Sequence, residues 1–114
     1  SFWPEPSLVL DAQPDSGPVA VMTTYFIHPE RETSFIDLMQ QVRLSRMRTG
    51  AFRWRLYRDG ESAHRFVELF LVASWEEHMR QHSERYTGFD AEMENRVSAL
   101  SDPPPQTSHL IATE

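Results

Sequence analysis

The sequence contains no cysteine and no lysine, has only four glycines, and lacks any long apolar run. Without cysteine there is no disulfide, no thiolate metal site and no cysteine nucleophile, which is compatible with a reducing compartment. Four glycines leave no Gly-rich phosphate loop. The longest apolar runs, Val19 to Met22 and Leu69 to Ala73, are far shorter than the ~20 residues that cross a bilayer, so we expect a soluble chain.

The missing lysine makes arginine the only strongly basic residue. All eleven basic residues are arginines, and six of them lie between Arg43 and Arg58, while the net charge is -6. Codon bias explains the absence of lysine most simply. The local arginines could also meet an anionic ligand, anionic lipid headgroups or acidic groups of a partner chain. Because the rest of the chain is acidic, we expect no nucleic-acid partner.

A length of 114 residues fits one domain with one modest core. Residues 1–18 contain four prolines among aspartate and serine and are predicted to be an N-terminal linker, with the folded domain at 19–114. The chain begins at Ser1 without a methionine or a signal pattern, so we expect it to be a fragment of a longer protein.

Alternation and helical spacing give the order of elements. We expect strands at 19–28, 51–58, 64–74 and 107–113, with helices after Pro29, at 75–84 and after Thr87, where Asp90 completes a near capping box. Gly50 is predicted to end the first helix, whose last turns carry Arg43, Arg46 and Arg48. The order β-α-β-β-α-β predicts an α+β, ferredoxin-like domain with an antiparallel sheet.

Each element has a predicted inner side. The second strand is expected to turn Phe52, Trp54 and Leu56 to one face, and Glu68 is the polar residue of an otherwise apolar third strand. Glu68 is interpreted as the partner of an arginine on a neighbouring strand, or alternatively as a general base or ligand contact. The helical stripes consist of Phe35, Leu38, Met39 and Val42, and of Phe89, Met93, Val97 and Leu100.

Both faces of the predicted sheet are apolar, although two helices can cover only one of them. A monomer would expose a larger apolar patch than most monomers tolerate. We therefore expect a homodimer that packs sheet against sheet as a dimeric α/β barrel.

Three segments and the linker carry a resemblance to a known family. The matching residues are Gly50, Ala51, Trp54, Leu56 and Asp59; Arg65 to Glu68, Phe70, Val72, Ser74, Trp75, Glu77, His78 and Arg80 to His82; Ser108 to Ala112; and, in the linker, Trp3 to Pro6 and Gly17 to Val19. They resemble the C-terminal domain of bacterial major facilitator superfamily exporters of the enterobactin-exporter-like group. This resemblance implies a cytoplasmic domain attached to a membrane-embedded parent chain.

The domain is also similar in fold to antibiotic biosynthesis monooxygenases. That resemblance implies that Trp75 and His82 hold the positions of a tryptophan and a histidine that these enzymes often carry. The same enzymes have a glutamate two residues before the tryptophan, where this sequence has Ala73. We therefore expect no catalytic residue.

The helix after the third strand holds the candidate ligand-binding residues. Trp75, His78, Met79 and His82 share one side of it and are expected to line a pocket between helix and sheet. The i, i+4 histidines could clamp a metal, but no third ligand is near in sequence and the HExxH pattern is absent. We therefore expect no metal and no cofactor. His109 on the last strand stays open between core and site.

Three functions remain after these exclusions. The resemblance favours a non-catalytic accessory domain of a transporter that mediates dimerisation and possible binding of a small molecule. The alternative is a cofactor-independent monooxygenase of the antibiotic biosynthesis type, in which Trp75 and His82, and Tyr25 as a further candidate, orient an aromatic substrate and accept its proton. Haem binding or degradation is a third possibility, but related barrels use an asparagine on the first strand, where this chain offers Thr23, Thr24 and Tyr25.

Overall fold

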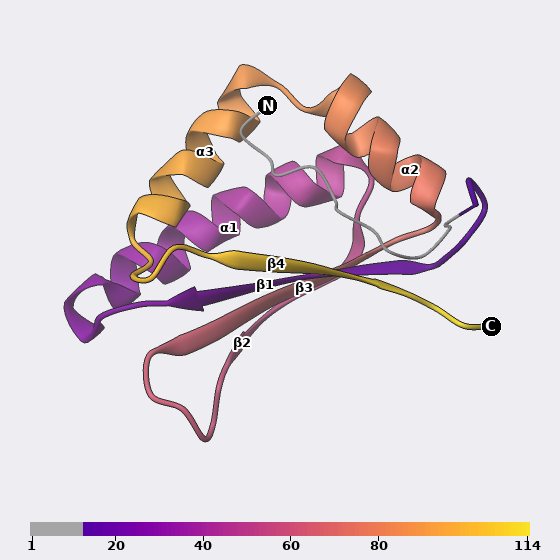
Figure 1. The fold of residues 1–114 in the computed structure, drawn as a ribbon. Helices are drawn as coiled ribbons and strands as arrows, with labels where there is room; N and C mark the ends of the chain where they lie inside the picture. The colour runs from indigo at the N-terminus through magenta and orange to yellow at the C-terminus, as the bar shows by residue number, and fades with distance from the viewer. Residues whose placement is uncertain (1–12) are drawn as a thin grey trace.

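The computed structural model describes residues 13–114 as a four-stranded antiparallel sheet with helices on one face (Figure 1). The strands are β1 (Val19–Phe26), β2 (Phe52–Arg58), β3 (Arg65–Val72) and β4 (Gln106–Ile111), in the sheet order β2-β3-β1-β4. The helices are α1 (Glu32–Thr49), α2 (Trp75–Arg80) and α3 (Gly88–Ala99), with a π-helical turn at Gln81–Arg85 after α2. The ferredoxin-like α+β fold is confirmed.

The two central strands, β1 and β3, follow the predicted alternation. Every second residue of each strand is buried beneath the helices. These are Val19, Val21, Thr23 and Tyr25 on β1, and Phe66, Glu68, Phe70 and Val72 on β3. The strands run antiparallel, with Val21 opposite Phe70 and Thr23 opposite Glu68. The core therefore lies between this face and α1, where the ring of Phe35 is 5.1 Å from the rings of Tyr25 and Phe66.

Strand β2 contains a bulge that the alternation did not predict. The pairing with β3 shifts between Phe52 and Arg55, and Arg53 has a φ of 55°. The extra residue moves Phe52 to the outer face, while Trp54 stays buried on the inner face. The prediction that Phe52 and Trp54 share a face is wrong for this reason.

Helix α1 begins and ends as the sequence predicts. Pro29 opens a 3₁₀ turn that leads into the helix, and Gly50 ends it with a φ of 128°. Phe35, Met39 and Val42 are fully buried. Arg46 was expected to complement the C-terminal end of this helix from its surface. Its side chain is instead almost completely buried.

The buried guanidinium of Arg46 meets the carboxylate of Glu68 in the core. Arg46 donates from Nε over 3.0 Å and from Nη2 over 3.2 Å, and its Nη1 pairs with Glu94 on α3. The same carboxylate accepts from Trp54 Nε1 at 2.8 Å and from the Tyr25 hydroxyl at 3.2 Å. The predicted arginine partner exists, but it comes from α1 rather than from a neighbouring strand.

Helix α3 is fixed to α1 through its first turn. Thr87 and Asp90 form the predicted capping box, and Asp90 is fully buried. Its carboxylate accepts from Ser45 Oγ at 2.5 Å and pairs with Arg48. Phe89 is 58% exposed, so its place in the predicted apolar stripe is wrong. Ala91 is buried together with Met93 and Val97 on the inward face of this helix.

The last part of the predicted linker packs on the start of α2, while residues 1–12 lie outside the described part. The carbonyl oxygens of Ser16 and Pro14 accept from the backbone N–H groups of Trp75 and Glu76, at 2.7 and 2.9 Å. Gly17 permits this approach, since a Cβ there would lie 2.6 Å from the carbonyl oxygen of Ala73. Residues 14–16 thus satisfy donors that a helix start leaves free.

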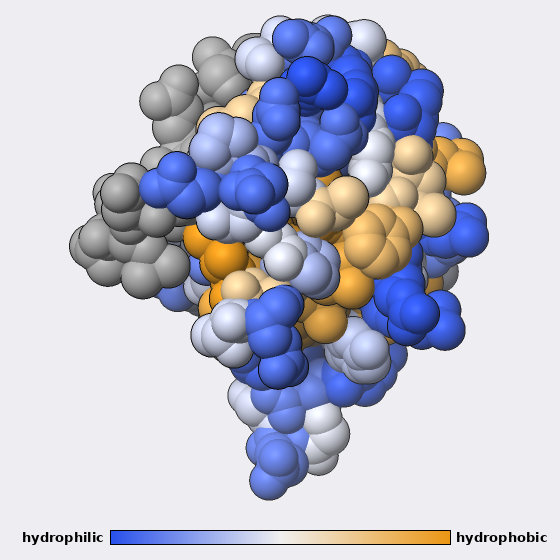
Figure 2. Space-filling view, turned by 90° about the vertical axis from the view of Figure 1, so that its right-hand side faces the viewer, coloured by the Kyte–Doolittle hydropathy of each residue, from blue (hydrophilic) through white to orange (hydrophobic). Residues whose placement is uncertain are grey.

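The outer face of the sheet has no cover among residues 13–114. Register places Met22, Leu71 and Leu110 on this face, and Phe52 and Tyr57 add aromatic surface from β2. Tyr57 and Leu110 are each 50% exposed. Figure 2 shows apolar surface between the hydrophilic helical layer above and the hydrophilic tip of the β2–β3 hairpin below.

We predict that Glu68→Gln destabilises the domain by about 3 kcal/mol, because it leaves the buried Arg46 guanidinium with only part of its counter-charge. Urea unfolding monitored by circular dichroism measures this loss. Glu61→Gln, in the exposed loop between β2 and β3, is the control and should change stability by less than about 0.5 kcal/mol. Equal stability of the two variants would contradict the role of Glu68.

Asp90 gives the stability a defined dependence on pH. Burial raises the pKa of Asp90, but hydrogen bonds from Arg48, Ser45 and Thr87 outweigh it and bring the pKa to about 2. An unfolded aspartate titrates near ~3.9, so the contribution is complete above that pH and is lost as the pH falls toward 2. We expect the difference in Tm between wild type and Asp90→Asn to shrink between pH 6 and pH 2. Glu92→Gln on the exposed side of α3 should show no such trend.

Candidate functional site

The predicted ligand-binding residues lie on α2 and the π-helical turn that continues it. Ser74 caps the helix by accepting from the backbone N–H of Glu77 at 3.1 Å. The i, i+4 spacing then brings His78 and His82 to the same side, and their Nε2 atoms are 2.9 Å apart. Both face the edge of the sheet formed by β4.

Three histidines meet at this edge. The ring of His78 lies 4.4 Å from that of His82 and 5.0 Å from that of His109 on β4. Trp75 packs beside them, with its ring 5.8 Å from His78 and 6.2 Å from His109. His78 is fully buried, whereas His82 and His109 are half-buried. We call His78, His82 and His109 the histidine cluster.

The amide of Gln81 sets the orientation of His78. Gln81 Nε2 donates to Thr49 Oγ1 at 3.0 Å, which turns the amide oxygen toward His78 Nδ1 at 3.1 Å. An amide oxygen only accepts, so His78 carries its proton on Nδ1. Its Nε2 therefore presents a lone pair to His82.

Burial favours the neutral form of the three imidazoles in the histidine cluster. Burial lowers the pKa of His78 to about 4, with smaller contributions of the same sign from His109 and Arg46. Burial also lowers the pKa of His82 to about 3, helped by His78, His109 and Arg46. The pKa of His109 is lowered by burial. Neutral imidazoles act as hydrogen-bonding groups or metal ligands rather than as cations.

The structure brings together three of the four predicted residues, namely Trp75, His78 and His82. Met79 is half-buried on α2 and is not a member of the ring stack. The sequence alone does not assign His109 to the core or to the site, although the alternation of β4 indicates which face of the sheet it lies on. His109 pairs with Val21, so it lies on the buried face of the sheet. The ligand-binding role of the four predicted residues stays a prediction.

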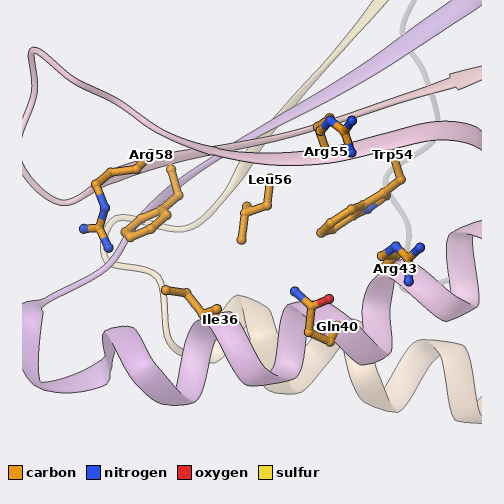
Figure 3. Close-up of a pocket in the computed structure, with 8 residues that line it drawn as sticks. Ile36, Gln40, Arg43, Trp54, Arg55, Leu56 and Arg58 are labelled. Atoms are coloured by element: carbon orange, nitrogen blue, oxygen red, sulfur yellow. The ribbon is translucent and has the colours of Figure 1, made fainter.

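A cavity of about 430 Å³ lies at the opposite edge of the sheet, between α1 and β2 (Figure 3). Trp54 and Leu56 point from β2 toward Gln40 and Ile36 on α1. Eight residues line the cavity: Ile36, Gln40, Arg43, Trp54, Arg55, Leu56, Arg58 and Phe66. The clustering of arginines between Arg43 and Arg58 was visible in the sequence, but the cavity that some of them line was not predicted.

Arginines give this cavity a positive rim over an apolar floor. Figure 3 places Arg43 and Arg58 at its two ends. Arg58 pairs with Glu32 and lies 4.8 Å from the ring centre of Phe66, which holds its guanidinium in place. The rim is suited to an anionic group and the floor to an apolar body.

Comparison with solved structures shows which proteins share this fold. A Caulobacter crescentus protein assigned to the antibiotic biosynthesis monooxygenases has a TM-score of 0.74 at 17% identity, covering 88% of this chain and 93% of its own. A cofactor-independent oxygenase from Streptomyces nogalater has 0.71 at 14%, covering 84% and 93%. A Bordetella bronchiseptica protein of the monooxygenase group has 0.68 at 24%, covering 86% and 99%. These similarities establish the fold alone.

Three further observations concern the chain itself. None of the helices within residues 13–114 has the length and apolar content needed to cross a membrane. A comparison with curated protein sequences found no match. The family model described as transmembrane secretion effector matches residues 1–114. The chain therefore belongs to the transmembrane secretion effector family, MFS_3, and is a transporter-associated domain, as the resemblance to the major facilitator superfamily implied.

Proposed function

We propose that the chain is a non-catalytic, cytoplasmic accessory domain of a major facilitator superfamily transporter. In this proposal, two copies pair through their sheets and each copy binds a small anionic molecule. The observation that supports this proposal most strongly is the apolar outer face of the sheet. Tyr57 and Leu110 are exposed on this face, and no described element covers them.

Pairing of two identical sheets accounts for this face. A twofold axis would place the same patch of each copy against the other, so no second kind of partner is needed. The centre of the patch is formed by Met22 on β1 and Leu71 on β3, which are only partly buried in the single chain. Sheet packing would bury these side chains as it does in the interior of a sandwich.

The fold supplies no separate argument for catalysis. Ala73 stands where the resembling enzymes carry a glutamate, and it is exposed at the end of β3. The buried carboxylate of Glu68 is already occupied by Arg46, Trp54 and Tyr25. These observations support a binding domain over a monooxygenase.

The cavity between α1 and β2 is the proposed ligand site. Its volume of about 430 Å³ falls within the roughly 300–1,000 Å³ of typical small-molecule pockets. Arg43 reaches it from α1, and Leu56 and Phe66 supply apolar surface. A flat aromatic carboxylate or sulfonate has the matching chemistry, since its anionic group would meet guanidinium and its ring would meet the floor.

For the dimer, we expect light scattering after gel filtration to give about twice the 13.3 kDa of the chain. Leu71→Asp should shift the protein to the monomer, because it places a charge at the centre of the proposed interface. Leu44→Asp on α1 removes a leucine that is 56% exposed but lies away from the sheet, and it should remain a dimer. A wild-type chain that is monomeric at all concentrations would overturn this part of the proposal.

For the ligand site, we use 8-anilinonaphthalene-1-sulfonate as an anionic aromatic probe and follow its fluorescence on titration. Arg43→Gln should weaken binding by about tenfold, which corresponds to the loss of one charge-assisted hydrogen bond. Arg96→Gln removes an exposed arginine of α3 that does not line the cavity, and it should bind as wild type does. Equal affinity of both variants would place the probe elsewhere.

A further inference from the structure

The histidine cluster joins residues from distant parts of the chain. His78 and His82 come from α2 and its π-helical continuation, and His109 comes from β4. One nitrogen from each ring can be chosen so that all three lie within 4.8 Å of one another. Among residues 13–114, these three histidines are the set of potential metal ligands whose ligand atoms lie close together. No carboxylate belongs to it.

His109 supplies an independent observation about the cluster. Its Nε2 atom is buried and has no hydrogen-bond partner within the described part of the chain. Buried polar atoms of native proteins are almost always satisfied, and an exception calls for a bound water or ion. The ring that carries this nitrogen lies 5.0 Å from the ring of His78, which itself contacts His82.

The surroundings orient His78 as metal-binding proteins orient their ligands. Gln81 accepts from His78 Nδ1, and it is itself held by Thr49 and by the backbone carbonyl of Arg46, at 3.0 and 3.5 Å. Such a partner fixes the tautomer and directs the other ring nitrogen to the metal. His78 Nε2 points into the cluster for this reason.

We propose that His78, His82 and His109 bind a divalent transition-metal ion, Zn²⁺ by preference, with the fourth position open to solvent or a ligand. Three imidazoles without a carboxylate suit Zn²⁺, Ni²⁺ or Cu²⁺ and do not suit Mg²⁺ or Ca²⁺. Zn–N bonds of about 2.0–2.1 Å in a tetrahedron require nitrogens roughly 3.3 Å apart. The observed 2.9 Å between His78 and His82 is close to this spacing.

Access and charge are compatible with an ion at this place. His82 and His109 are half-buried, so the open position faces solvent from their side, while Trp75 closes the site beside His78 and His109. The nearest buried cation, Arg46, is compensated by two carboxylates, Glu68 and Glu94. This site differs from the arginine-rimmed cavity, which lies at the other edge of the sheet, so either can exist without the other.

The test is calorimetric titration of the tag-free, chelator-treated chain with ZnCl₂. We expect one Zn²⁺ per chain, and a loss of affinity of at least about 100-fold in His109→Ala and in His82→Ala, since each removes one ligand of three. His28→Ala removes a half-exposed histidine outside the cluster and should bind as wild type does. Undiminished binding by His109→Ala, or no binding by the folded wild type, overturns the proposal.

A second readout does not depend on whether the variants fold. Wild-type chain loaded with Co²⁺ should develop the visible absorption of a four-coordinate site with nitrogen ligands, and one equivalent of Zn²⁺ should remove it. Retention of a six-coordinate, aqueous-type Co²⁺ spectrum would overturn the proposal. Failure of the anionic probe to bind would leave these results unchanged, because the probe tests the other edge of the sheet.

Discussion

The buried carboxylate of Glu68 is the interaction on which the arrangement of the layers depends. It lies on the central strand β3 and is bonded to Tyr25 of β1, Trp54 of β2 and Arg46 of α1. Arg46 extends the network to Glu94 of α3. A charge in this position is tolerated only because every oxygen finds a donor, so the positions of three strands and two helices are mutually determined. Trp54 lines the arginine-rimmed cavity, so its hydrogen bond to Glu68 also fixes part of the cavity wall.

The two faces of the sheet differ in what covers them and in the sites that they form. One face is filled by the core, and at its two edges it leaves the cavity beside β2 and the histidine cluster beside β4. The other face is apolar and has no cover within residues 13–114. In the proposed dimer, the outer face supplies assembly while both inner edges remain accessible. Binding and assembly therefore would not compete for the same surface.

The sequence predicted the features that follow from strand alternation and helix capping. It did not predict the features that depend on contacts between residues far apart in the chain. Alternation identified the buried residues of β1 and β3, and the capping residues Thr87 and Gly50 marked helix ends correctly. The bulge at Arg53 and the burial of Arg46 could not be predicted, because each is decided by a neighbouring element rather than by spacing. The candidate site shows the same limit.

His109 illustrates that limit most directly. The i, i+4 spacing of His78 and His82 is visible in the sequence, but no third potential ligand lies near them in sequence. The third histidine is 27 residues beyond His82 and is brought back by the pairing of β4 with β1, opposite Val21. Helix α2 is too short to hold its own orientation, since isolated helices below about 12 residues are marginal. Its placement comes from residues 14–16 at its start and from Gln81 at its end, so these contacts, and not the helix alone, determine whether the three imidazoles can meet.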